Sequence, residues 1–361
     1  MKYKLGEICK IVSGTTPKTS IAEYWDGDIK WLTPAEIKDD SYTIYDTFRK
    51  ITLLGKEKSG LNLFPKGTVI LSSRAPIGKV AIAGCDMCCN QGFKNLICSE
   101  KVYNKYLYWF LKTKKDYLNS LGRGATFKEI SKQIVSEIII NLPSYNEQGK
   151  IVDKLERLQK IVAIRKQQLL QLDKLIKALF IEMFGDPIEN KTGWRTIPLL
   201  ETGQCKNGIN YSSKESGVEM HCLGVADFQD NTVIDDMSVL PVVSLKESPN
   251  DDYLLQDGDI VFVRSNGNKA LVGRSVVVYP GDEPVVYSGF CIRYRKESED
   301  LLTDYLLRFF KTDSVRAKMA GRGANIQNLN QQILAALNVP IPSIELQKEF
   351  SLFVKQSDKS K

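Results

Sequence analysis

Apolar residues recur in alternating steps of four and three through the middle of the chain, with one break at Arg165. Such steps place a single apolar stripe along a helix and are typical of a coiled-coil seam. We therefore predict one long helix with a seam that could bind a partner helix. The seam consists of Ile151, Leu155, Leu158, Val162, Leu169, Leu172, Ile176, Leu179 and Met183.

Both ends of this helix carry recognisable signals. Ser144 and Glu147, just after Pro143, form the sequence of a capping box, and Gly185 followed by Pro187 supplies a left-handed cap and a stop. At about 1.5 Å per residue, roughly 40 residues span on the order of 60 Å, which favours a spacer. The alternative is a long core helix in an ordinary α/β protein.

The segments on either side of the helix are copies of one another. Residues 1–104 predict short strands separated by Gly and Pro turns, and a helix is predicted over 105–121. The segment DYLLRFFKT at 304–312 matches KYLYWFLKT at 105–113, and GRGA at 321–324 matches GRGA at 122–125. Both matches have the same offset of 199 positions. The chain is therefore a tandem duplication.

The predicted fold is α/β: two tandem, pseudo-repeated domains, β-rich with helices, joined by the long coiled-coil helix. We expect domains at 1–143 and 187–342, the spacer helix at 144–186 and the start of a shortened second helix at 343–361. The loops at 13–18 and 206–211 differ between the copies. Such divergence is expected if each copy reads a different target, although neutral drift in loops gives the same picture.

Bulk composition adds limited information. The formal net charge of +7 and the pI of about 8.8 weakly favour a polyanionic partner. The eight cysteines form no disulfide framework, and we find no secretory segment and no run of membrane-spanning length, so we expect a cytoplasmic protein with reduced thiols. The one histidine, His221, argues against histidine-based catalysis.

No catalytic motif is found. The segment at 141–145 resembles a methyltransferase clamp, but its repeat partner at 340–343 lacks the Asn and Tyr. Gly122 and Gly124 form only half of a dinucleotide fingerprint, and the acidic residues at 186–189 are better explained as a linker. Four cysteines, at 85, 88, 89 and 98, have no equivalent set in the second copy, so zinc is disfavoured. We predict no catalytic residue, no metal and no cofactor bound by this chain.

Basic and polar side chains gather on predicted loops, where Arg and Lys can neutralise phosphates and Arg, Asn and Ser can bond to base edges. Arg123 and Arg322 are the strongest candidates, because each lies between two glycines at the common offset. A solvated or salt-bridged surface residue is the alternative for each. The predicted DNA-binding residues are Thr15, Thr16, Lys18, Ser73, Arg74, Lys79, Arg123, Lys128, Lys206, Arg264, Asn266, Lys269, Arg322 and Asn325.

The whole chain resembles the specificity subunits of Type I restriction-modification systems. The resemblance rests on YKLGEICKIVSGTTP at the N-terminus, GDIKWLTPAEI, LPSYNEQGKIVDKLE, the MFGDP…GW junction at 183–194 and the duplicated domain order. It implies two target recognition domains that read the halves of a bipartite site in double-stranded DNA. It also implies a non-catalytic scaffold for two modification subunits, which carry S-adenosylmethionine and methylate adenine N6, and for restriction subunits that use ATP and Mg.

One feature departs from that family. Its second helical region is about as long as the first, whereas here the helix predicted from Ser343 ends with the chain at Lys361. We expect a second copy of this chain, or helices of the modification subunits, to cover the long helix. The alternatives are a silent or truncated variant that only dimerises or binds partners, and an autonomous DNA-modifying enzyme.

Overall fold

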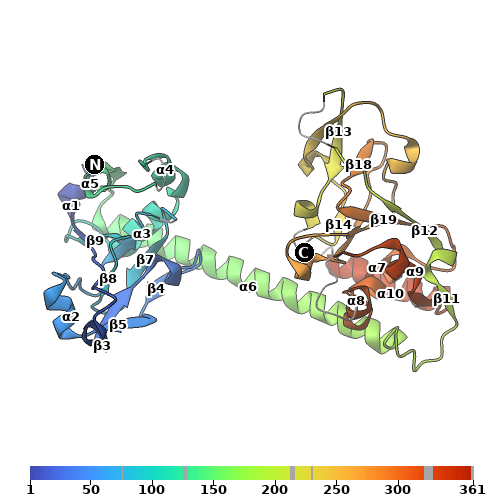
Figure 1. The fold of residues 1–361 in the computed structure, drawn as a ribbon, viewed down its shortest axis with the longest axis horizontal. Coiled ribbons are helices and arrows are strands. Elements are labelled where there is room, and N and C mark those ends of the chain that lie inside the picture. Colours follow the sequence, from blue (N-terminus) through green and yellow to red (C-terminus); the bar gives the residue numbers. More distant parts are fainter. Residues whose placement is uncertain (75, 125–127, 212–215, 229–230, 321–327, 359–361) are drawn as a thin grey trace. The chain divides into compact units, whose positions relative to one another are not determined.

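The computed structural model describes residues 1–74, 76–124, 128–211, 216–228, 231–320 and 328–358. It divides into two compact units, Met1–Ile164 and Arg165–Lys361. One helix of 40 residues, α6 (Tyr145–Phe184), belongs to both, so the predicted α/β architecture of two β-rich domains joined by a long helix is confirmed (Figure 1).

The first unit is built on a five-stranded sheet in the order β2-β9-β6-β7-β4 and a three-stranded sheet in the order β5-β3-β8. A two-stranded pair, β1 (Lys2–Lys4) with β10 (Ile139–Asn141), joins the two ends of this domain. The other strands are β2 (Cys9–Ser13), β3 (Trp25–Leu32), β4 (Thr43–Ile44), β5 (Arg49–Ile51), β6 (Val69–Leu71), β7 (Val80–Ala83), β8 (Cys88–Cys89) and β9 (Lys94–Cys98).

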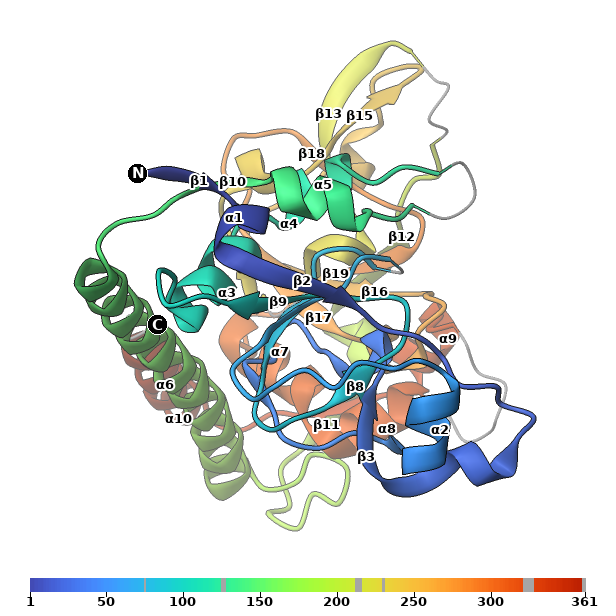
Figure 2. The ribbon, with the colours of Figure 1, turned by 90° about the vertical axis from the view of Figure 1, so that its left-hand side faces the viewer.

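Helix α3 (Asn104–Lys112) packs on β6 and β7 of the five-stranded sheet. Figure 2 shows this helix in teal in the first unit. The single helix predicted over 105–121 is wrong, because the chain leaves helical geometry at Lys114 and resumes as α4 (Lys115–Ser120). Leu111 before the break and Leu118 after it are both buried in the same core. The remaining elements are α1 (Leu5–Ile8), α2 (Leu53–Lys58), α5 (Lys132–Glu137), η1 (Ala22–Tyr24) and η2 (Pro34–Glu36).

The second unit repeats this topology strand for strand, which confirms the duplication. Its sheets have the orders β12-β19-β16-β17-β14 and β15-β13-β18, and β11 pairs with β20. The strands are β11 (Thr196–Pro198), β12 (Gly203–Asn207), β13 (Val218–Leu223), β14 (Val233–Ile234), β15 (Val242–Leu245), β16 (Asp259–Val263), β17 (Ser275–Val278), β18 (Val285–Tyr287), β19 (Cys291–Lys296) and β20 (Asn338–Pro340).

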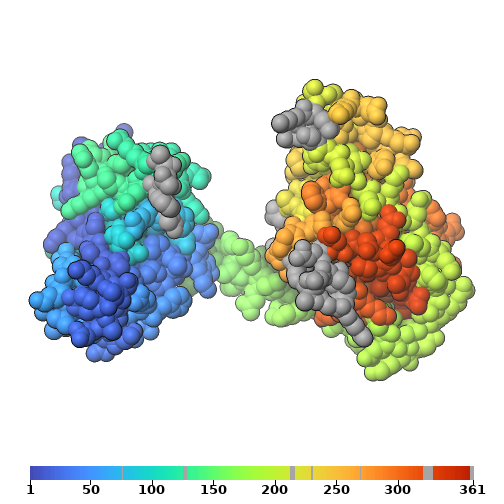
Figure 3. All heavy atoms as spheres, viewed as in Figure 1, coloured from blue at the N-terminus to red at the C-terminus, as the bar shows by residue number. Residues whose placement is uncertain are grey.

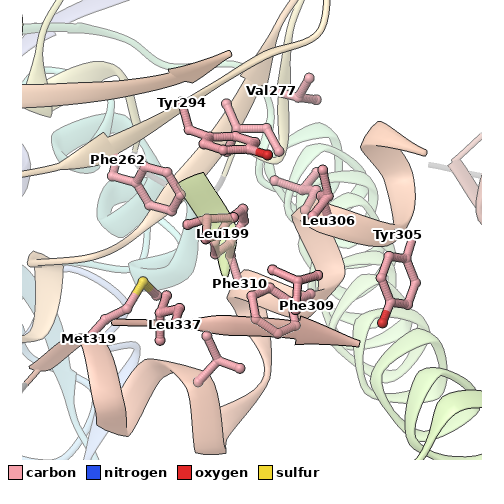
Figure 4. Packing of buried hydrophobic residues seen from close by; sticks show 14 of the residues in the cluster. Leu199, Phe262, Val277, Tyr294, Tyr305, Leu306, Phe309, Phe310, Met319 and Leu337 are labelled. Atoms are coloured by element: carbon pink, nitrogen blue, oxygen red, sulfur yellow. The ribbon is translucent and has the colours of Figure 1, made fainter. Parts of the chain in front are cut away.

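The main core of the second unit lies between its five-stranded sheet and α7 (Thr303–Lys311) (Figure 4). Phe262 of β16 and Tyr294 of β19 meet Phe310 of α7 at ring-centroid distances of 4.8 and 5.9 Å. The other helices are α8 (Asp313–Ala320), α9 (Gln331–Ala335), α10 (Ile344–Asp358), η3 (Leu199–Glu201), η4 (Val225–Phe228), η5 (Met237–Val239), η6 (Asp251–Tyr253) and η7 (Lys269–Leu271).

The predicted ends of α6 are confirmed. The Ser144 hydroxyl and backbone N–H both donate to the Glu147 carboxylate, at 2.7 and 3.0 Å, and the Glu147 N–H donates to the Ser144 hydroxyl at 3.4 Å. Gly185 follows the last turn with φ +78°, in the left-handed region that favours glycine.

The predicted seam of α6 divides into two parts. Its C-terminal end is covered within the second unit: Ile176 is buried, and Leu172, Leu179 and Met183 pack against the same core. Of the remaining seam residues, Ile151, Leu158 and Val162 are exposed, and Leu155 and Leu169 are half-buried.

Two residues outside the predicted seam complete the covered part, Phe180 and Phe184. Both contact Phe350 of α10 at 5.5 Å between ring centroids. The described part of α10 therefore packs against the last turns of α6.

Candidate nucleic-acid interface

Three loops of the first unit meet at one end of the five-stranded sheet: 72–79 after β6, 90–93 before β9, and 122–130 after α4. The Ser73 N–H donates to Gly92 O at 2.8 Å, and the Ile130 N–H donates to Ser73 O at 3.0 Å. Arg74 and Arg123 each form a β-bridge with Glu129. The fold thus brings together residues that lie up to 57 positions apart in the sequence, from 73 to 130.

Arg123 is exposed at this junction, and its backbone is paired with that of Glu129. Its backbone N–H donates to Glu129 O, and the Glu129 N–H donates to Arg123 O, both at 3.0 Å. Gly124 follows with φ +126°, which a side chain rarely adopts. Lys128 is exposed on the same loop. The backbone of Arg123 is therefore paired with that of Glu129, while its side chain is exposed to solvent.

An ion pair between a buried lysine and a half-buried glutamate lies where the three loops meet. Lys94 of β9 is 7% exposed and binds the Glu129 carboxylate at 3.0 Å, with a further hydrogen bond of 3.3 Å to the Ser73 hydroxyl. Ser73 is itself fully buried, so it supports the loop from inside. The Lys79 ammonium donates to Pro34 O at 3.2 Å and is half-buried.

The loop at 14–18 joins the same surface through the 90–93 turn. The Thr15 N–H donates to Cys89 O at 3.1 Å, and the Thr16 hydroxyl bonds to the Gln91 side chain. Two indoles hold the loop from below: Trp31 donates to Thr15 O at 3.0 Å and Trp25 to Lys18 O at 3.3 Å. Thr15 and Lys18 are exposed.

The second unit places Arg264 at the equivalent junction. Its N–H donates to Phe290 O at 2.8 Å, its guanidinium donates to Gly289 O at 3.1 Å, and the Leu329 N–H donates to Arg264 O at 2.8 Å. Asn266 lies on the same loop, where its side-chain oxygen accepts from the Asn268 N–H at 2.8 Å. Arg322, Asn325 and the Lys269 side chain lie outside the described residues.

Lys206 differs from the predicted arrangement. The structure places it in β12 and not in a loop, and its side chain is 27% exposed. The ammonium binds Asp252 at 2.9 Å and lies 4.1 Å from the centre of the Tyr253 ring. This lysine is therefore already neutralised within the protein, and β12 extends to Asn207 because it pairs with β19.

The two divergent loops share a feature that the sequence analysis did not identify, a glycine packed closely against backbone carbonyls. A Cβ at Gly14 would lie 2.1 Å from Cys89 O, and a Cβ at Gly208 would lie 2.2 Å from Ser288 O. Both glycines therefore permit the same close approach to the turn before β9 or β19. The signal in the sequence is a glycine directly after each of these strands, Gly14 after β2 and Gly208 after β12. The Lys94–Glu129 pair was also missed, and a charged residue in the buried strand KNLIC was its signal.

Cysteine chemistry is not favoured at these surfaces. Burial raises the pKa of the Cys88 thiol to about 11 and that of Cys89 to about 12, so both are protonated near neutral pH. Among the described residues no group of three or more His, Cys, Asp or Glu side chains could hold a metal ion. His221 lies with Nδ1 3.0 Å from Leu240 O. No described helix is long and apolar enough to cross a membrane.

The sequence matches the family described as Type I restriction modification DNA specificity domain over residues 1–174 and 206–361. It is 39% identical over 230 residues to the MjaIX specificity subunit of Methanocaldococcus jannaschii, covering 59% of this chain and 53% of that protein. The chain thus spans about half the length of that relative. It is 24% identical over 328 residues to the EcoKI specificity subunit of Escherichia coli, covering 83% and 69%.

Solved structures share the fold. A chain from a structure concerned with complex assembly and conformational transition of the type I R-M system aligns with a TM-score of 0.59 and 16% identity, covering 99% of this chain and 90% of that one. The S subunit of the Type-I restriction-modification system from M. genitalium aligns with a TM-score of 0.50 and 16% identity, covering 100% and 89%.

Proposed function

The chain belongs to the Type I restriction modification DNA specificity family, and from this premise we propose that it recognises double-stranded DNA sequence-specifically for a Type I restriction-modification complex. Each unit reads one half of a bipartite site. The chain itself performs no chemistry. It scaffolds two modification subunits, which hold S-adenosylmethionine, and restriction subunits, which use ATP and Mg.

The observation that carries this proposal is that both units have the same backbone arrangement where the three loops meet, but different side chains there. The three loops converge in both units through matching backbone bonds, Ser73 with Gly92 and Arg264 with Phe290. At this junction the first unit carries the Lys94–Glu129 ion pair, whereas the second carries Ile292 and Asn328 at the corresponding strand and loop positions. The same backbone arrangement with different polar side chains suits a protein that reads two different half-sites.

Within this proposal the residues at the loop junction have two different roles, phosphate contact and base contact. Arg123 and Lys128 lie on the rim of the junction and suit phosphate contact, which positions the duplex. Thr15 and Thr16 lie on the loop that diverges between the copies and suit contact with base edges. Lys206 and Ser73 support the surface from within.

A second candidate function is a silent variant that binds partners without reading DNA. The exposed apolar residues in the centre of α6 favour it, because they offer a surface for another helix whether or not DNA is bound. DNA binding by the purified chain separates the two.

The test is methylome sequencing of a host that expresses the modification partner, with this gene present and deleted. Loss of one bipartite N6-methyladenine motif on deletion would establish the recognition role and give both half-sites. An unchanged methylome, together with no sequence preference in duplex binding by the chain and its partner, would leave the silent variant as the function.

A further inference from the structure

Glu129 lies between two arginines at the loop junction of the first unit. It forms an antiparallel β-bridge with Arg74 on one side and with Arg123 on the other. Residues directly opposite each other in antiparallel pairs carry their side chains on the same face. The fold therefore places one carboxylate in a row between two arginine side chains. In Figure 3 the light blue surface of the segments around β6 and β7 borders the blue-green surface of the segments around α4 and α5.

The Glu129 carboxylate is held from inside and accessible from outside. Its Oε1 accepts from the Lys94 ammonium at 3.0 Å, and the lysine side chain is 8% exposed, whereas that of Glu129 is 39% exposed. Within the described part of the chain this carboxylate forms no second ion pair, although two arginines flank it. An ionised carboxylate only accepts hydrogen bonds and has about four lone-pair sites, so it can accept from a donor outside the protein.

The ion pair is not needed to build the junction. In the second unit Ile292 and Asn328 take the places of the lysine and the glutamate, so both charges are absent there. The backbone is nevertheless the same, because Asn328 forms an antiparallel bridge with Ser265. The N–H of the next residue donates to the preceding loop at 2.8 Å, against 3.0 Å in the first unit. One backbone arrangement thus carries a carboxylate in one unit and an amide in the other, which favours contact with different ligands over a role in folding.

The chemistry of the carboxylate selects the group that it can bind. DNA phosphates repel a carboxylate, so it contributes to duplex binding only where it accepts a hydrogen bond from a base. In the major groove glutamate accepts from the N4 amino group of cytosine, and arginine donates to O6 and N7 of guanine. A G·C pair therefore presents a donor next to acceptors. The Glu129 carboxylate, with Arg74 opposite it on the neighbouring segment, is complementary to this pattern.

We propose that Glu129 reads a cytosine in the half-site of the first unit, with its carboxylate accepting from the cytosine N4 amino group. Lys94 is a positioning residue, since it holds the carboxylate from inside and is itself almost fully buried. This inference rests on the proposed DNA recognition and adds one base at one position. Asn328 at the matching place can donate as well as accept, which suits adenine N6 and N7.

The first experiment is methylome sequencing of a host that expresses the modification partner with the full-length chain or a variant. Glu129→Gln keeps the length of the side chain but adds a donor, so we expect one position of one half-site to lose its cytosine preference. Asn328→Asp makes the reverse change in the second unit and should alter one position of the other half-site. The matched control is Glu137→Gln, which breaks another lysine pair of the first unit, Lys4 with Glu137 at 2.6 Å, and should leave the motif unchanged.

The second experiment measures duplex binding by the chain together with its modification partner. Each cytosine of the altered half-site is replaced in turn by pyrimidin-2-one, a cytosine analogue that lacks the N4 amino group. We expect one replacement to weaken binding by the wild type roughly 5- to 150-fold, the range for one specific base contact, and to change binding by Glu129→Gln little. The difference between these two effects isolates the contact from other consequences of the substitution.

The outcomes separate this inference from the proposed function. A bipartite motif that is methylated with the wild type and unchanged with Glu129→Gln would keep DNA recognition and reject the role of Glu129. Equal binding of the wild type to every analogue duplex and to the parent duplex would reject it too, even where Glu129→Gln abolishes methylation. If adding Lys94→Met to that inactive variant restores the original motif, the carboxylate only neutralises the lysine and the inference is wrong. No motif and no sequence preference with the wild type would reject DNA recognition itself.

Discussion

Gln148 and Gln347 occupy the same place in the two units and make the same three hydrogen bonds. In each case the side-chain oxygen accepts from a backbone N–H just before α3 or α7, and the side-chain nitrogen donates to two carbonyls. For Gln148 the partners are Tyr103, Lys101 and Pro143, at 2.7, 3.0 and 3.1 Å. For Gln347 they are Leu302, Asp300 and Pro342, at 2.8, 2.9 and 3.0 Å.

We expect Gln148→Leu to destabilise the first unit by about 2–4 kcal/mol, because it leaves a buried N–H and two carbonyls without partners. Gln148 is fully buried, so water cannot replace the amide without rearrangement. Chemical denaturation followed by tryptophan fluorescence and far-UV circular dichroism measures the effect. Gln347→Leu is the matched variant and should act on the other unit. If both variants shift the same transition, the two units do not unfold separately.

The close approach at Gly14 gives a second prediction. Gly14→Ala would place a methyl 2.1 and 2.2 Å from the carbonyls of Cys89 and Asn90, which backbone cannot easily avoid. We expect a loss of about 1–3 kcal/mol in stability, as for other overpacked sites, and weaker duplex binding because the loop at 14–18 must move. Gly149→Ala is the opposite case: nothing lies within 4 Å of its added methyl, and alanine suits a helix, so we expect a gain of about 0.5–1 kcal/mol. Equal effects of the two substitutions would contradict the assigned geometry.

The cap of α6 predicts a pH dependence. Hydrogen bonds from the Ser144 hydroxyl and then from its backbone N–H hold the pKa of Glu147 below its ordinary value. Because the pKa of this carboxyl is lower in the folded state, the carboxylate stabilises the fold fully above its unfolded-state pKa of about 4.3. This stabilisation is lost as the pH falls through the folded-state pKa. The second helix has Leu346 at the matching position, where the Ser343 hydroxyl accepts from the Leu346 N–H at 3.3 Å.

Glu147→Leu therefore copies the natural cap of α10 into α6. We expect the variant to be less stable than the parent at pH 7, with the difference disappearing below about pH 3. Denaturation midpoints at pH 7, 5, 4 and 3 test this expectation. A difference that persists undiminished at pH 3 would mean that the carboxylate charge plays no part in the cap.

The exposed arginine at the loop junction predicts how DNA affinity depends on salt. Arg123→Gln should weaken binding of target and non-target duplexes alike and lower the salt slope by about 0.9, since one phosphate contact is lost. Lys191→Gln is the control: that side chain is 83% exposed, pairs with Glu189 at 2.7 Å and lies in the segment after α6. A loss restricted to one target sequence would instead identify Arg123 as a base contact.

The parts of the fold that the sequence predicted correctly have local or repeated signals. The Ser144–Glu147 cap, the Gly185 stop and the offset of 199 positions need no knowledge of tertiary packing. The C-terminal part of α6 shows the limit of this reasoning. The predicted seam followed a period of 3.5 residues, but Phe180 and Phe184 follow Ile176 in steps of four, because this end packs against a domain and not along a partner helix.

Much of the candidate site could not be predicted, because its residues come from distant segments that meet only in the folded structure. Lys94 and Glu129 are separated by 35 residues and meet only because β9 and the loop after α4 end at the same edge. Contacts between distant segments leave no periodic signal in a single sequence.

The centre of α6 supplies the last prediction. Leu158 and Val162, from the predicted seam, are 57% and 53% exposed, and Ile161 and Ile164 beside them are 61% and 57% exposed. Four large apolar side chains within two turns form a patch that a chain in water tends to cover. The described part of α10 meets α6 near its C-terminal end, where Phe350 contacts Phe180 and Phe184.

We therefore expect the isolated chain to self-associate through its long helices, with a dimer in light scattering and sedimentation at micromolar concentration. Leu158→Glu with Val162→Glu should give a monomer, because four like charges would meet across the paired seam, while circular dichroism should show the same helix content. Lys160→Glu is the control: it changes charge at a polar position between the two substituted residues and should leave the dimer intact. A wild-type monomer with a melted α6 would contradict self-association, and recovery of helix content on adding the modification subunit would then assign the patch to that partner.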